Sequence, residues 1–348
     1  MEKPIALFAE IESSEERIYK GRLIGYRVFG SEDPLTESTL ARFSEANLRN
    51  AQVLSVMIHS KVTSAVLNEM PNLEHIVARS TGFDHIDCQE ASLRGIEVST
   101  VPEYGSATVA EYTFGLILNL TRHIHKSHLR TVTGDFSYDG LLGTELSGKT
   151  LGIVGLGRIG RHVSRMGQAF DMKVLAFDPL VAKAFAHWAE IPLVSLHDLL
   201  ASSDIIAICC PLTKSTHHLL DDAAFSQMKD GVLVVNTARG AIVDPTALIR
   251  GLQAGRVAGA ALDVLEGEAS VSEEAALAVL GLGNKDVAEA LAKNLALIRH
   301  PNVIVTPHMA YFTNEALERI RATTIDNIRA FEAGASKNLV RLPASAIG

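Results

Sequence analysis

Short apolar runs alternate along the chain with longer segments in which apolar residues recur every three or four positions. In the first hundred residues the apolar runs span 4–9, 26–30, 53–58, 74–79 and 96–101. The segments between them, such as 38–50 and 63–70, have the spacing of amphipathic helices. Strands that alternate with helices favour a parallel sheet covered by helices on both faces. The first part of the chain is therefore predicted to be an α/β domain.

A second alternation follows a segment over residues 107–126 that is predicted to form one long helix. Its apolar runs span 150–155, 173–178, 204–210, 232–238, 257–264 and 303–308. The fold predicted for the whole chain is α/β, with two doubly wound parallel-sheet domains. Residues 314–334 have a helical period and come after the last of these strands, so they can pack back on the first domain and make it discontinuous. Residues 269–299 are rich in helix formers and are predicted to form an insertion between two strands.

Composition and charge argue against several classes of function. The chain has 348 residues, enough for two domains, and 47% of them are hydrophobic. The net charge of −8 offers no basic excess for nucleic acid or for an anionic membrane. No apolar run approaches the roughly 20 residues of a membrane helix, and the start lacks a secretory signal. The cysteines Cys88, Cys209 and Cys210 match no metal spacing, so we expect reduced thiols, no metal site and a cytoplasmic protein.

A glycine-rich motif, GLGRIG at residues 155–160, follows one apolar run and opens a helical segment. Gly155 permits a tight turn, Gly157 lets the backbone approach a pyrophosphate, and Gly160 allows the helix to pack closely on the strand. The helix N-terminus presents N–H groups to phosphates, and Arg158 can add positive charge. This context predicts a dinucleotide-binding Rossmann domain.

Asp178 indicates which dinucleotide is bound. It ends the next apolar run, 18 residues beyond Gly160 (178 − 160). A carboxylate at this place accepts hydrogen bonds from the ribose hydroxyls and repels a 2′-phosphate. We therefore expect NAD rather than NADP as the cofactor.

Three polar residues suited to hydride-transfer chemistry follow later strands of the same predicted sheet. Arg239 follows the run 232–238, Glu268 comes shortly after the run 257–264, and His308 ends the run 303–308. The carboxyl ends of parallel strands meet at one edge, so these side chains can converge there. Reduction of a 2-oxo acid needs a cation to bind and polarise the substrate, for which Arg239 is suited, and a proton donor, for which His308 is suited. Glu268 would hold His308 in its protonated form.

The first domain can also contribute to the substrate site. Ser80, Thr81 and Gly82 are predicted to form a turn at a strand end, where backbone N–H groups can bind a carboxylate. Tyr104 is placed near the crossing between the domains.

Together these motifs resemble the D-isomer-specific 2-hydroxyacid dehydrogenases. The resemblance covers nearly the whole chain and rests on GLGRIG with Asp178, VNTARG, LDVLEGE and VTPH, and on the stretches STGFDHID and VPEYGSATVAEYT. It implies a flavodoxin-like substrate domain formed by residues 1–103 with 311–348, an NAD-binding domain over 104–310, and a homodimer supported by the long helix. The residues it implies are catalytic Arg239, Glu268 and His308; cofactor-binding Gly155, Gly157, Arg158, Ile159, Gly160, Asp178, Pro211, Thr237 and Asp263; and substrate-binding Ser80, Thr81, Gly82, Tyr104 and Tyr311.

Within the family the segment after His308 and the long insertion are similar to the D-lactate dehydrogenase branch, which implies pyruvate as the substrate. That branch commonly has an aromatic residue where this chain has Met57 and Ile58, so a larger aliphatic 2-oxo acid, glyoxylate or hydroxypyruvate stays open. Glu268 stands where formate dehydrogenases have glutamine, and the chain is short for a phosphoglycerate dehydrogenase with a regulatory domain. A binding protein similar to the NAD-sensing corepressors of the family is the alternative from another class.

Overall fold

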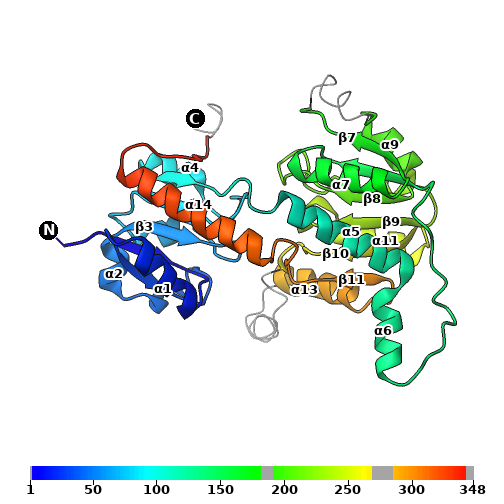
Figure 1. Ribbon diagram of the computed structural model, residues 1–348, viewed down its shortest axis with the longest axis horizontal. Coiled ribbons are helices and arrows are strands. Elements are labelled where there is room, and N and C mark those ends of the chain that lie inside the picture. The colour runs from blue at the N-terminus through cyan, green and yellow to red at the C-terminus, as the bar shows by residue number, and fades with distance from the viewer. Residues whose placement is uncertain (1, 182–190, 269–284, 342–348) are drawn as a thin grey trace. The chain divides into compact units, whose positions relative to one another are not determined.

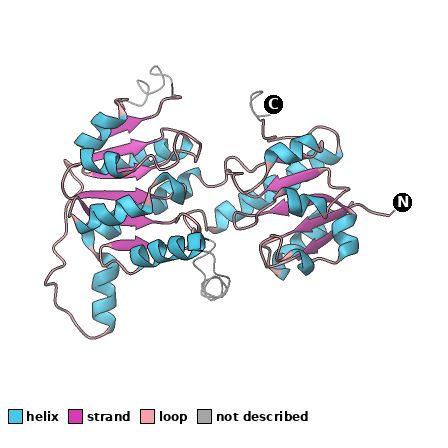
Figure 2. Cartoon of the chain, turned by 180° about the vertical axis from the view of Figure 1, so that it is seen from behind, coloured by secondary structure: helices cyan, strands magenta, loops and turns pink. Residues whose placement is uncertain are grey.

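The computed structural model describes residues 2–181, 191–268 and 285–341. The chain divides into two compact units, Met1–Tyr104 with Thr313–Gly348, and Gly105–Phe312. The boundaries expected from the sequence, 103/104 and 310/311, lie one and two residues from these. Figure 1 and Figure 2 show a parallel sheet with helices on both faces in each unit.

The first unit is built on a five-stranded parallel sheet in the order β2-β1-β3-β4-β5. The strands are β1 (Ile5–Phe8), β2 (Arg27–Gly30), β3 (Ala51–Val56), β4 (His75–Ala78) and β5 (Glu97–Ser99). Each lies within or overlaps an apolar run of the sequence. The order 2-1-3-4-5 is that of flavodoxin-like sheets, which confirms the predicted fold class.

Apolar side chains on the two faces of this sheet form separate cores. On one face Leu7, Leu54 and Ile76 pack under the short helices α2 (Glu45–Arg49), α3 (Ser64–Asn68) and α4 (Cys88–Leu93). On the other face, Phe8 and Val53 pack with residues of α1 (Ser13–Arg22) and α14 (Asn314–Glu332). The tail helix α14 thus covers the first sheet, although more than 200 residues separate it from β5.

The second unit is built on a six-stranded parallel sheet in the order β11-β10-β9-β8-β6-β7. The strands are β6 (Thr150–Val154), β7 (Lys173–Phe177), β8 (Ile205–Ile208), β9 (Val232–Asn236), β10 (Val257–Leu262) and β11 (Val303–Val305). A parallel bridge from Ala176 to Leu193 adds a short further pairing beside β7. With that pairing the order is 3-2-1-4-5-6 plus one edge strand, as in Rossmann domains. The connection changes direction between β6 and β8, where such folds bind ligands.

Helices cover both faces of the second sheet. On one face are α5 (Ser106–Arg122) and α7 (Arg158–Ala169), and on the other are α9 (Leu196–Ser202), α10 (Asp222–Gln227), α11 (Pro245–Gln253) and α13 (Lys285–Ile298). The 3-10 turns are η1 (Leu40–Arg42) in the first unit and η2 (Gly240–Ile242) in the second. Helix α13 forms most of the second half of the insertion predicted over residues 269–299, whereas residues 269–284 lie outside the described residues.

The prediction of a single helix over residues 107–126 is wrong. Helix α5 ends at Arg122, and α6 (Ile124–Val132) begins after His123, whose φ of 52° is in the left-handed region. A left-handed residue ends an α-helix, and the Asn119 side chain accepts from the backbone N–H of His125 at 2.9 Å, which stabilises the break. Helix α6 projects beyond the edge of the sheet, and the following segment returns to β6 (Figure 1, Figure 2). Within the described residues, no helix is long and apolar enough to span a bilayer.

Candidate active site

The glycine-rich loop has the geometry of a phosphate-binding turn. Gly155 has φ 98°, which a residue with a side chain rarely adopts, and its N–H donates to Phe177 at 2.8 Å. Gly157 directly precedes α7, and apart from its chain neighbours no described residue has an atom within 4 Å of where its Cβ would be. A Cβ on Gly160 would overlap the carbonyl oxygen of Gly155, so the helix start needs glycine there. These features leave an open space before the N-terminus of a 12-residue helix, which suits a pyrophosphate.

Asp178 lies beside this loop, at the end of β7. One carboxylate oxygen accepts from the N–H of Leu156 at 2.8 Å, and the other accepts from Leu180 and Val181 at 2.9 and 3.1 Å. The carboxylate therefore ties the glycine-rich loop to the turn after β7.

The three residues expected to perform the reaction follow three neighbouring strands. Arg239 follows β9, Glu268 comes six residues after the end of β10, and His308 comes three residues after the end of β11. All three strands are parallel, so their carboxyl ends lie at one edge of the sheet.

His308 and Glu268 form a close pair at that edge. Nδ1 of His308 lies 2.7 Å from a carboxylate oxygen of Glu268, and the side chains are 13% and 32% exposed. The other carboxylate oxygen of Glu268 accepts from the N–H of Leu265 at 3.3 Å, and the Glu268 N–H donates to Leu265 O at 3.3 Å. The carboxylate is thereby held by its own turn while it fixes the orientation of the imidazole.

Asp263 shapes the loop that carries His308. Its buried carboxylate accepts from the Thr306 hydroxyl at 2.6 Å and from the N–H groups of Met309 and Ala310 at 3.0 and 2.9 Å. The Asp263 carbonyl accepts from the His308 N–H at 2.8 Å, which supports a left-handed backbone at His308, φ 52°. Burial raises the pKa of the Asp263 carboxyl, and the hydrogen bonds from Thr306 and the loop oppose that effect. The Asp263 carboxylate is thus engaged with the loop that positions the histidine.

The turn that carries Arg239 packs directly on the turn that carries Glu268. Asn236 holds the Arg239 turn, since its Nδ2 donates to Arg239 O at 2.9 Å and its Oδ1 accepts from Ala238 N at 3.0 Å. A Cβ on Gly240 would overlap the backbone of Leu265 and its neighbour. Glycine at this position brings the arginine turn and the glutamate turn together.

The remaining residues expected at the cofactor have structural contacts. The Thr237 hydroxyl lies 2.8 Å from that of Thr113 on α5 and is buried. Ile159 packs against the core beneath α7, and the carbonyl of Pro211 accepts from the Thr216 hydroxyl at 2.7 Å. Arg158 is the first residue of α7.

Four of the expected substrate residues belong to the first unit. The Ser80 hydroxyl donates to Gly82 O at 2.6 Å and that of Thr81 to Val101 O at 3.0 Å, which closes a turn after β4. The Tyr104 carbonyl accepts from Arg319 Nε at 2.7 Å. Tyr311 belongs to the second unit, and its ring lies edge-on to Phe312.

Two residues that the sequence reasoning missed are central to this geometry. Thr306 anchors Asp263, and its place directly before the Pro-His pair is a signal that sequence reasoning could have used. Gly240 directly follows Arg239, but its tight packing on residues from 265 onward is a tertiary contact without a linear signature.

The comparisons with known proteins agree with one another. Residues 114–310 match the family model described as D-isomer specific 2-hydroxyacid dehydrogenase, NAD binding domain. A 2-hydroxyacid dehydrogenase homolog from Schizosaccharomyces pombe is 38% identical over 298 residues, which cover 85% of this chain and 87% of the relative. A D-lactate dehydrogenase from Escherichia coli is 34% identical over 308 residues, 88% of this chain and 91% of the relative.

A solved structure gives the same result for the fold. The D-lactate dehydrogenase of Aquifex aeolicus, in complex with NAD and lactic acid, superposes with a TM-score of 0.86 at 36% identity. The match covers 97% of this chain and 100% of the other. The chain therefore belongs to the D-isomer specific 2-hydroxyacid dehydrogenase family and is an NAD-dependent oxidoreductase.

Proposed function

We propose that the protein is a D-lactate dehydrogenase that interconverts pyruvate and D-lactate. The observation that carries the proposal is the 2.7 Å pair of His308 and Glu268 beside the Arg239 turn. The similarity to D-lactate dehydrogenases from two bacteria supports the choice of substrate.

The residues have distinct roles in this proposal. The glycine-rich loop and Asp178 would hold the cofactor, which would supply the redox chemistry: NAD+ would accept a hydride from D-lactate, and NADH would give one to pyruvate. Arg239 binds the substrate carboxylate with its planar guanidinium and polarises the carbonyl, where negative charge develops during reduction. Because Nδ1 of His308 is bonded to Glu268, we assign proton transfer to Nε2. The Glu268 carboxylate stabilises the imidazolium before the proton is given.

The stereochemistry and identity of the product test this proposal. Turnover is measured by NADH absorbance with a panel of 2-oxo acids whose side chains increase in size. We expect the highest turnover with pyruvate or a slightly larger aliphatic acid. Chiral analysis should find the D product. An L product, or no turnover across the panel, would contradict the proposed function.

The panel also decides between the open alternatives. In the D-lactate branch an aromatic residue is common at the stretch where this chain has Met57 and Ile58. The Met57 side chain is buried in this structure. A maximum at a larger acid, at glyoxylate or at hydroxypyruvate would move the substrate and leave the chemistry intact. A corepressor-like protein would bind NADH without turning over any member of the panel.

We propose that Asp178 selects NADH over NADPH. Replacing it with alanine removes the ribose hydrogen bonds and the repulsion of a 2′-phosphate, so the preference for NADH should shrink by about tenfold or more. The measurement is kcat/KM for both cofactors with one substrate. Because the carboxylate also holds Leu156, Asp178→Asn is the matched control for loop structure. Unchanged cofactor kinetics in both variants would mean that Asp178 does not contact the ribose.

We also propose that the protein is a homodimer that associates through the projecting arm, residues 124–142. The arm exposes apolar side chains, among them Leu129 at 63%, Val132 at 69% and Phe136 at 81%. A second copy is a fitting occupant, since such a run of exposed apolar residues marks an interaction surface. A cavity of about 330 Å³ beside the arm, lined by His123, His125 and other residues, gives that copy a concave surface.

Sedimentation of a charged variant tests this interface. The double substitution of Leu129 and Val132 by glutamate should convert the dimer into monomers at micromolar concentration. Leu93→Glu, at a similarly exposed position in the first unit, is the control and should stay dimeric. A parent protein that sediments as a monomer would refute the homodimer, and an arm variant that stays dimeric would place the interface elsewhere.

A further inference from the structure

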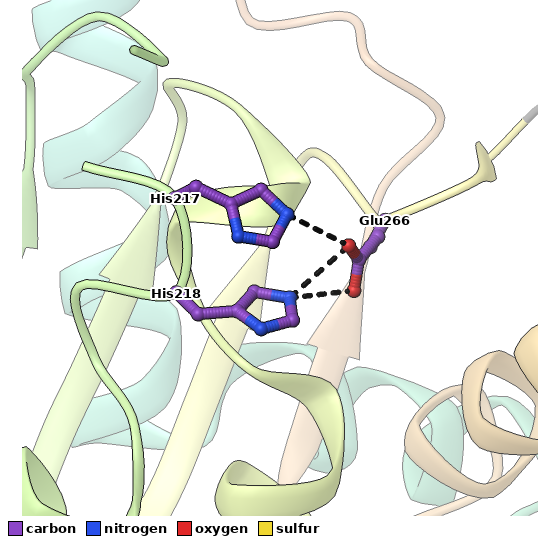
Figure 3. A group of neighbouring side chains, drawn as sticks. All are labelled: His217, His218 and Glu266. Carbon is purple, nitrogen blue, oxygen red and sulfur yellow. Dashed lines mark hydrogen bonds and ion pairs between the residues drawn. The ribbon is translucent and has the colours of Figure 1, made fainter. Parts of the chain in front are cut away.

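Two histidines and a glutamate form a cluster that the proposed reaction does not use. Nε2 of His218 lies 3.1 and 3.0 Å from the two carboxylate oxygens of Glu266, and Nε2 of His217 lies 3.7 Å from one of them. Figure 3 shows both imidazoles directing a nitrogen at the same carboxylate. The rings stack with centroids 4.0 Å apart. One ligand atom from each of the three residues lies within 4.8 Å of the other two.

The backbone holds the histidines in place. His218 has φ 49°, in the left-handed region, and its N–H donates to Ala241 O at 2.8 Å. The N–H of Leu220 donates to Ile242 O at 3.1 Å. The segment that carries the histidines is therefore fastened on the η2 turn.

The glutamate is fastened on the same turn and on α13. The Glu266 carbonyl accepts from Asn294 Nδ2 at 2.9 Å, and the Glu266 backbone packs against Gly240. Since both halves of the cluster rest on η2, the three side chains are presented together before any ligand binds. A preformed set of ligands lowers the entropic cost of binding.

The donor set indicates the class of ligand. Two imidazole nitrogens and one carboxylate oxygen suit zinc and similar divalent transition metals, which bind these atoms at roughly 2.0–2.2 Å. Magnesium and calcium prefer sets made of oxygen alone. The three ligand atoms lie within 4.8 Å of one another, close enough for one ion to contact all three after local adjustment. The His217 side chain is 52% exposed, which leaves a path for entry.

We propose that His217, His218 and Glu266 form a binding site for a zinc-class divalent cation, with water completing the coordination. The site does not depend on which 2-oxo acid the enzyme reduces. The proposed metal site lies next to the reacting residues, because Glu266 is two residues from Glu268 on the same turn. The alternative is that His218 and Glu266 form an ordinary ion pair, with His217 stacked beside it.

Metal titration of the purified, chelator-treated enzyme distinguishes the two. Calorimetry with ZnCl₂ at neutral pH should find one site per chain with a dissociation constant in the micromolar range or tighter. CoCl₂ should give the visible absorption of a bound cobalt ion with nitrogen ligands. MgCl₂ should not compete, and binding should weaken at acid pH because protons compete for the imidazoles.

Variants locate the site. His217→Ala and Glu266→Gln should each weaken zinc binding by at least tenfold, and NADH oxidation without added metal should stay within about twofold of the parent. His197→Ala, at an exposed histidine bonded to Gln227, should bind zinc as the parent does. His308→Ala should also keep the site, which separates it from binding at the reacting pair.

Several results would overturn the proposal. These are a parent that binds no zinc, undiminished affinity in both His217→Ala and Glu266→Gln, or loss of binding in His308→Ala. If His217→Ala is unstable, His217→Gln keeps the bulk of the side chain and should show the same loss of affinity. Failure of the D-lactate proposal would leave all of these titrations unchanged.

Discussion

His308→Ala should lower kcat for 2-oxo acid reduction by about 10² to 10⁴, because a positioned side chain that transfers a proton contributes a factor of that size. The loss should be present at every pH, since the alanine side chain has no proton to give. The affinity for NADH, measured by fluorescence titration, should change little. His218→Ala, at a histidine on the neighbouring turn, is the control and should keep most of the activity. A His308→Ala enzyme that retains more than a tenth of the parent kcat would mean that another group gives the proton.

Gly240→Ala should damage stability and catalysis together. The new Cβ would overlap the backbone of residues 265 and 266, so the arginine turn or the glutamate turn must shift. Overpacking of this kind costs about 1–3 kcal/mol of unfolding free energy. A shift of about 1 Å at reacting groups can lower the rate by roughly 10²-fold.

Both effects of Gly240→Ala are measurable in one preparation. Urea unfolding gives the stability, and kcat/KM with the best 2-oxo acid gives the catalytic loss. Gly21→Ala is the matched control, because it lies in α1 and its new Cβ would meet no atom within 4 Å beyond its chain neighbours and its own helix. It should leave kcat/KM unchanged and should not lower stability, since alanine favours a helix more than glycine does. Parent-like kcat/KM in Gly240→Ala would show that the two turns do not position Arg239 and Glu268.

The fold could be predicted from the sequence because its strands are short apolar runs with clear ends. Each described strand lies in or overlaps a predicted run, and the motif GLGRIG located the start of α7. The break at His123 was not readable. A helical period continues through that residue, and the break depends on the Asn119 side chain and on the backbone of one residue.

The sequence predicted only those residues of the candidate site that follow the ends of strands. Arg239, Glu268 and His308 were identified because each follows a strand of one sheet, and adjacency of the strands brings the residues to one edge. The network around them was not predictable. Asp263 binds a loop more than 40 residues away, and His218 meets Glu266 across 48 residues, so neither contact leaves a spacing in the sequence.

The most direct test of the account is the pH profile of kcat/KM for Glu268→Gln against the parent, with one 2-oxo acid and saturating NADH. Reduction requires the imidazolium of His308, so the parent rate should fall as pH rises. Glutamine keeps the shape of the side chain but removes the charge that stabilises the imidazolium, so the falling limb should move to lower pH while activity at acid pH largely survives. A limb that stays at the parent's position would contradict the proposed pairing, even in an active dehydrogenase.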